Sequence, residues 1–151
     1  MKFSEGEMTV EKAAELAGKG YMCSQCVFAH FAPELGLSEE LALQLSSSFG
    51  GGSFYGGTCG AVVGANLALS MEHGWSEDPT MEQIKNMERR TREFNARFAE
   101  RNGSILCREI LGKSFADPEE TAEIYAQNLM ARCPAVISSA CEILADLLEE
   151  E

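Results

Sequence analysis

The sequence predicts an all-α fold, an irregular helical bundle of about seven or eight helices in a single domain over residues 1–151. Apolar residues recur with the helical period through most of the chain, and glycine and serine separate the periodic segments. No stretch alternates polar and apolar residues over a useful strand length. With 151 residues, 45% of them hydrophobic, the chain can bury a core of its own.

Three helices are expected before residue 50. The first two span residues 10–17 and 23–31, and the third begins at residue 39. Thr9 and Ser38 are the expected N-caps of the first and third, because a hydroxyl oxygen can accept from a free amide of the first turn. The second stops around Pro33, since proline lacks the amide proton that a helix interior needs. The expected inward face of the third helix consists of Leu41, Leu45 and Phe49.

The segment GGGSFYGGT, residues 50–58, is too rich in glycine to form regular structure. The helix that follows, from Gly60 to about Glu72, is apolar on nearly every side, which is typical of a buried helix. Several of its residues are small enough for neighbouring helices to approach closely: Gly60, Ala61, Gly64, Ala65 and Ala68.

Four further helices are expected in the second half of the chain, over about residues 80–102, 104–111, 117–132 and 133–148. Thr80 caps the first of them, and Asp117 with Pro118 opens the third. The longest helix has the expected inward stripe Met81, Ile84, Met87, Thr91, Phe94 and Phe98. The last has the stripe Ile137, Ala140, Cys141, Leu144 and Leu148.

The charge of the chain restricts its partners. Twelve basic against 24 acidic residues give a formal net charge of −12, which argues against nucleic acid and against anionic membrane surfaces. No apolar run approaches the roughly 20 residues of a membrane span, and residues 1–10 do not resemble a signal peptide. These features lead us to expect a cytoplasmic protein. We also expect a redox partner protein, and a homodimer because apolar residues are in excess.

Six cysteines are many for a chain without a secretion signal, and in that setting they indicate metal binding or redox chemistry. Cys23, Cys59 and Cys133 each lie at or next to an expected helix start, where free amides lower the pKa of a thiol. Cys107 is expected inside a short helix and lacks this argument. Any one of these cysteines could instead fill the core.

The two remaining cysteines are weaker candidates. Cys26 forms a CxxC pair with Cys23, so it either pairs with that thiol or packs in the interior. Cys141 lies on the apolar stripe of the last helix and is expected to be a core residue.

Five motifs occur in a distinctive order: GYMCSQ (20–25), FGGG (49–52), CGAVVG (59–64), GSILCREILG (103–112) and Cys133. Their order resembles the C_GCAxxG_C_C family of redox-active proteins over roughly residues 13–148. The resemblance implies four key cysteines, which here are Cys23, Cys59, Cys107 and Cys133. A similar domain occurs in split-Soret cytochromes, with which a non-haem iron-sulfur centre has been associated. Met22 stands where the family often has asparagine, and Cys26 stands where it usually has a small residue.

The first functional hypothesis is an iron-sulfur cluster, [2Fe-2S], or another metal held by the thiolates of those four cysteines, for electron transfer or redox sensing. Recombinant protein can lack such a centre. Backbone amides of helix starts and of the glycine-rich loop would surround the cluster, from Gly51, Gly52, Gly57, Thr58 and Gly60.

Two alternatives stay open from the sequence. The first is metal-free thiol–disulfide chemistry, with Cys23 and Cys59 as the redox thiols and Cys26 as a resolving thiol. The second is a structural zinc ion on the four thiolates. No serine–histidine–acid set and no apolar carboxylate pair is recognisable, so we do not expect hydrolysis.

Overall fold

A computed structural model describes residues 2–150 and confirms the all-α fold. Its α-helices are α1 (Val10–Gly18), α2 (Cys23–Phe31), α3 (Glu39–Leu45), α4 (Gly60–His73), α5 (Met81–Asn102), α6 (Cys107–Leu111), α7 (Pro118–Ala126) and α8 (Cys133–Glu149). A π-helical turn, η1 (Gly52–Gly56), precedes α4, and a 3-10 turn, η2 (Leu129–Arg132), precedes α8. Between residues 2 and 150 no strand forms, and the β-type pairing consists of one isolated antiparallel bridge.

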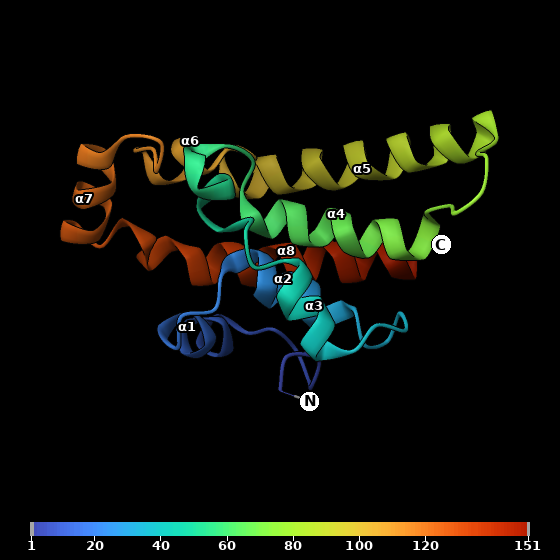
Figure 1. Cartoon of the computed structure of the whole chain (residues 1–151), viewed down its shortest axis with the longest axis horizontal. Coiled ribbons are helices and arrows are strands. Elements are labelled where there is room, and N and C mark those ends of the chain that lie inside the picture. The colour runs from blue at the N-terminus through green and yellow to red at the C-terminus, as the bar shows by residue number, and fades with distance from the viewer. Residues whose placement is uncertain (1, 151) are drawn as a thin grey trace.

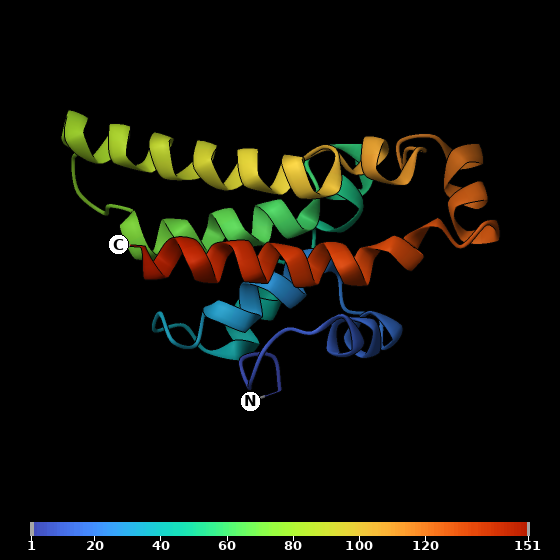
Figure 2. The ribbon, with the colours of Figure 1, turned by 180° about the vertical axis from the view of Figure 1, so that it is seen from behind.

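The long helices α4, α5 and α8 run side by side along the molecule, and α1, α2 and α3 cover one side of this group (Figures 1 and 2). Helix α2 packs more extensively against α4 than against any other element. Gly64 permits this close crossing, because a Cβ at that position would lie 2.7 Å from the carbonyl oxygen of Ser24. Figure 1 shows α6, α7 and the first turns of α8 together at one end of the molecule.

Side-chain caps fix three helix starts where the sequence predicts them. The hydroxyl oxygens of Thr9, Ser38 and Thr80 each accept a hydrogen bond from the backbone amide three residues later, at 3.1 Å. At Thr80 the Gln83 side chain also accepts from the Thr80 amide at 2.9 Å, which completes a capping box. These caps depend on neighbouring residues only, and they are therefore readable from sequence.

The expected face of α3 is wrong. Leu41 and Leu45 are 43% and 54% exposed, and Ala42 is the residue that α3 buries. The expectation extended the stripe to Phe49, but the helix ends at Leu45. The next residue, Ser46, is buried, and its hydroxyl donates to the Ala42 carbonyl at 2.7 Å. The helix therefore has only two turns, which is too few for an apolar stripe to determine which of its faces is buried.

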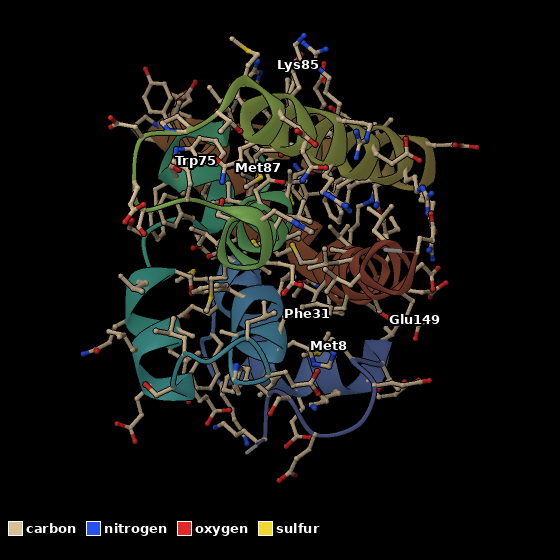
Figure 3. All side chains as sticks on the ribbon, turned by 90° about the vertical axis from the view of Figure 1, so that its right-hand side faces the viewer. Met8, Phe31, Trp75, Lys85, Met87 and Glu149 are labelled. Atoms are coloured by element: carbon tan, nitrogen blue, oxygen red, sulfur yellow. The ribbon has the colours of Figure 1, made fainter. Side chains whose placement is uncertain are left out.

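The inward stripe of α5 is confirmed only in its second half, where Phe94 and Phe98 are fully buried. Met81 is 64% exposed, because the first turns of α5 extend past the end of α4 (Figure 1). Figure 3 looks onto that end, where Trp75 and Met87 lie near the α4–α5 corner and Lys85 points away from the molecule. Helix α4 thus packs against only part of the length of α5.

The helix expected over residues 117–132 is interrupted. Helix α7 ends at Ala126, and Asn128 adopts a left-handed conformation with φ of 53°. Asparagine tolerates this conformation better than most residues. The chain then continues through η2 into α8. In α8 the residues Ile137, Ala140, Cys141 and Leu144 are buried as predicted. None of the helices between residues 2 and 150 has both the length and the apolar character of a membrane span.

Candidate functional site

Four cysteines from distant parts of the chain line one cavity of about 230 Å³. Cys23 is the first residue of α2, Cys59 the N-cap of α4, Cys107 the first residue of α6, and Cys133 the first residue of α8. The four cysteines that the family resemblance singled out are thus the four that meet. The expectation that Cys107 lies inside its helix is wrong, because α6 begins at this residue.

A short β-type pairing joins the two segments that contain Cys59 and Cys107. The amide of Cys59 donates to the carbonyl oxygen of Ile105, and the amide of Cys107 donates to that of Gly57, both at 2.7 Å. The isolated bridge between Thr58 and Leu106 lies between these two bonds. Sequence reasoning missed this pairing, because a bridge of one residue pair leaves no alternating pattern.

The glycine-rich loop has a defined left-handed conformation. Four consecutive residues, from Gly51 to Phe54, have φ between 56° and 64°. Ser53 and Phe54 adopt it without glycine's freedom, at a cost of about 1–2 kcal/mol each. The loop turns the Gly51 amide toward the sulfur of Cys23, to which it donates a hydrogen bond.

The loop residues expected to contact a cofactor divide into two groups. Gly51 and Gly60 line the cavity, whereas Gly52, Gly57 and Thr58 do not. Gly60 is required by close packing, because a Cβ there would lie 2.4 Å from the Cys23 sulfur and 2.8 Å from the carbonyl oxygen of Phe49. Gly60, the first glycine of the CGAVVG motif, therefore leaves space for the Cys23 side chain.

The Cys23 sulfur is surrounded by donors. The Cys59 thiol hydrogen-bonds to it, and the amides of Gly51, Ser24 and Ala61 add further bonds. Together they outweigh the opposing effect of burial and lower the pKa of Cys23 to about 7. The same contact raises the pKa of Cys59 well above its ordinary value, because Cys59 supplies the proton and is itself buried.

The other two thiols of the cavity stay protonated at neutral pH. Burial, followed by the negative charge of Cys23, raises the pKa of Cys107 to about 11 and that of Cys133 to about 12. The expectation that helix starts lower the pKa of Cys59 and Cys133 is therefore wrong. At Cys59 the hydrogen bond to Cys23 and then removal from water outweigh the partial charge of a helix start, and at Cys133 removal from water does so.

Cys26 and Cys141 lie outside the cavity. Cys26 is fully buried in α2, and burial raises its pKa to about 12. Cys141 is buried on α8, as its apolar stripe predicted. All six cysteines are free thiols. As the side chains lie, no three His, Cys, Asp or Glu residues in the described part of the chain form a group that could hold a metal ion.

Sequence reasoning also missed the apolar residues around the thiols. The wall includes Tyr21 and Met22 before α2, Phe115 after α6, Tyr125 of α7 and Met130 of η2. Three of these come from the segment between α6 and α8, which has no cysteine and no recognisable motif. These three residues line the cavity only because the segment between α6 and α8 folds over it, and this fold is not apparent from the sequence.

Comparison with known proteins places the chain in a family. The family model described as "Putative redox-active protein (C_GCAxxG_C_C)" matches residues 21–147. The match covers most of the chain and all four cysteines of the cavity. Neither the curated proteins nor the solved structures contain a match. The chain therefore belongs to the C_GCAxxG_C_C family, as its motifs predicted.

Proposed function

We propose that this member of the C_GCAxxG_C_C family is a dithiol–disulfide redox protein, in which Cys23 is the attacking thiol and Cys59 the resolving thiol. One observation carries the proposal. The two thiols are hydrogen-bonded to each other, and the bond separates their pKa values in opposite directions. A thiolate is the nucleophile in disulfide exchange, and Cys23 is half ionised near neutral pH.

Exposure assigns the order of the two steps. Cys23 is half-buried, whereas Cys59 is 7% exposed, so an incoming disulfide meets Cys23 first. The Cys23 thiolate attacks one sulfur of a substrate disulfide, a mixed disulfide forms, and the other sulfur leaves as a thiolate. Cys59 then loses its proton to a departing thiolate and attacks the Cys23 sulfur, and the second half of the substrate leaves. Both electrons of the dithiol have then passed to the substrate, which leaves as one thiol and one thiolate.

The proposal is tested by trapping and mapping the oxidised protein. Reduced protein is treated with one equivalent of an uncharged disulfide and blocked with N-ethylmaleimide, and its peptides are analysed by mass spectrometry. We expect a linkage between Cys23 and Cys59, and a lasting mixed disulfide on Cys23 in the Cys59→Ser variant. Cys141→Ser removes a buried thiol outside the cavity and is the matched control. Oxidation that proceeds equally well in Cys23→Ser would refute the assignment.

A second candidate function is an iron-sulfur centre, and a specific observation favours it. Four cysteines on one cavity are the donor set that clusters use, and backbone amides already donate to the Cys23 sulfur. The thiolates of Cys23, Cys59, Cys107 and Cys133 would hold the cluster, which would supply one-electron transfer. Because the side chains as they lie form no site for a single ion, the thiols must turn before they can hold it.

The two candidates differ in what reconstitution produces. Anaerobic incubation with ferrous iron and sulfide, followed by desalting, gives a coloured protein with bound iron and acid-labile sulfide if the cluster forms. Incubation with zinc alone separates a structural ion from a cluster, because zinc leaves the protein colourless. If the protein binds no iron, no sulfide and no zinc after these incubations, the metal-binding functions are excluded and disulfide exchange remains.

A further inference from the structure

Apart from the thiolate of Cys23, the wall of the four-cysteine cavity contains no charged residue. Its eighteen lining residues are cysteines, glycines, alanine, aliphatic residues, methionines and aromatic residues. Deep in the cavity lie aliphatic side chains such as Ile110, Leu111 and Ile137, all at most 5% exposed. A ligand group that enters must leave its water behind and gains little hydrogen bonding in return.

Two arginines adjacent in sequence to lining cysteines donate to backbone carbonyl groups, and the Lys2 ammonium donates to the hydroxyl of Tyr21 at 3.1 Å. Arg108 donates to the carbonyl oxygen of Gly56 at 3.0 Å, and Arg132 donates to that of Ile110 at 2.6 Å. Neither lines the cavity. An anionic ligand would therefore lose its hydration without a counter-ion, and it would also approach a chain with a net charge of −12. The loss of hydration opposes any charged ligand, and the negative net charge opposes anions only.

We infer that the site accepts uncharged, apolar disulfides and rejects charged ones, anionic disulfides most strongly. This inference rests on the proposed disulfide exchange at Cys23 and adds its substrate class. A volume of about 230 Å³ is below the roughly 300 to 1,000 Å³ of pockets for drug-sized ligands. One half of a small disulfide, such as an aromatic ring, therefore enters while the leaving half stays at the mouth. The bond that breaks is the substrate's S–S bond, and the bond that forms joins one of its sulfurs to Cys23.

Two chromogenic disulfides of opposite character test the inference. 4,4′-Dithiodipyridine is uncharged at pH 7.5, and 5,5′-dithiobis(2-nitrobenzoate) is a dianion. The rate constant of each with the reduced protein is measured from the absorbance of the released thiol. The same protein unfolded in urea is the reference, because it has the same thiols without the cavity and so corrects for the intrinsic reactivity of each probe.

We expect the ratio of the two rate constants, uncharged over dianionic, to be at least tenfold higher in the folded protein than in the unfolded reference. The preference should persist at 0.5 M salt, because salt screens the distant net charge more than it affects desolvation inside the cavity. An equal or lower ratio in the folded protein overturns the inference, because the cavity would then give the uncharged probe no advantage.

Two matched variants separate the cavity from the overall charge. Met130 lines the cavity and is 37% exposed, whereas Met71 on α4 is 36% exposed and does not line it. Met130→Lys should raise the rate with the dianion at least fivefold, because it places a counter-charge at the mouth. Met71→Lys adds the same charge elsewhere and should change that rate less than twofold. Equal effects of the two variants would overturn the inference.

Cys23→Ser distinguishes failure of the inference from failure of the proposed function. If the variant reacts with both probes as fast as the original protein, Cys23 is not the attacking thiol and both proposals fall. If the variant reacts slowly but the original protein shows the charge preference of the unfolded chain, disulfide exchange stands and the inference about its substrate fails.

Discussion

Replacing Cys59 with alanine should raise the pKa of Cys23 from about 7 to the ordinary thiol value or higher. The Cys59 thiol is the largest of the contributions that lower this pKa. Without it, the amides of Gly51, Ser24 and Ala61 still donate to the sulfur, but burial opposes them. The variant therefore tests whether the neighbouring thiol or the backbone stabilises the Cys23 thiolate.

The size of the effect follows from the titration. At pH 7 about half of Cys23 is ionised in the original protein, and only about 3% would be ionised with a pKa of about 8.5. The thiolate population thus falls about 15-fold. A thiolate of higher pKa is also a stronger nucleophile, with a Brønsted slope of about 0.4–0.5, so each remaining thiolate reacts about four- to sixfold faster. The net decrease in rate at pH 7 is therefore only about three- to fourfold, and the midpoint of the pH profile is the sharper measurement.

The assay is the rate of reaction with 4,4′-dithiodipyridine between pH 6 and 10, with Cys23→Ser as the background to subtract. We expect the midpoint to move from about 7 in the original protein to at least about 8.5 in Cys59→Ala. Cys141→Ala, which removes a buried thiol outside the cavity, should leave the midpoint in place. A midpoint that stays near 7 in Cys59→Ala would refute the reasoning, since the backbone amides alone would then account for the acidic thiol.

Three other predictions concern stability, each measured by urea unfolding of the reduced protein. Gly60→Ala should destabilise by about 1–3 kcal/mol, because the new Cβ meets the Cys23 sulfur and the Phe49 carbonyl, whereas Gly18→Ala meets nothing within 4 Å and should be neutral or stabilising; equal effects would contradict the packing argument. Ser53→Gly should stabilise by about 1 kcal/mol by relieving its positive φ, and a loss of stability would show that the serine side chain matters more than the backbone. Stability should fall above about pH 8.5, the ordinary thiol pKa. A thiol whose pKa is raised by folding stabilises the protein fully below its unfolded pKa, and this contribution is lost as the pH rises. Between pH 8.5 and 9.5 the loss is about 1 kcal/mol for each such thiol. Cys23 has a lowered pKa, so its contribution to stability changes with pH in the opposite direction, but it is one thiol against five. Stability that rises from pH 8.5 to 9.5 would contradict the raised pKa values of those five thiols, which are Cys26, Cys59, Cys107, Cys133 and Cys141.

The sequence alone was sufficient for most of the helix starts and for the four cysteines that line one cavity. The caps at Thr9, Ser38 and Thr80 are bonds between residues three apart, so the local sequence contains both partners. The order of the glycine and cysteine motifs identified the family, and with it the four cysteines that meet in the cavity. The face of α3 and the end of α7 were predicted wrongly, because a two-turn helix and a single left-handed Asn128 leave little periodic signal.

Only the tertiary structure decided how those cysteines differ chemically. A helix start is a local feature, and by itself it predicted the same acidic thiol at Cys23, Cys59 and Cys133. Burial and the contact between Cys23 and Cys59 come from segments far apart in the chain, and they make one thiol acidic and the others resistant to ionisation. The largely apolar wall of the cavity has the same origin, since it is composed of residues from α1, α2, α4, α6, α7, η2 and α8 and from the loops between them. The pKa of a thiol depends on its burial and on hydrogen bonds from segments that are distant in the chain. Neither can be predicted from the spacing of residues in the sequence.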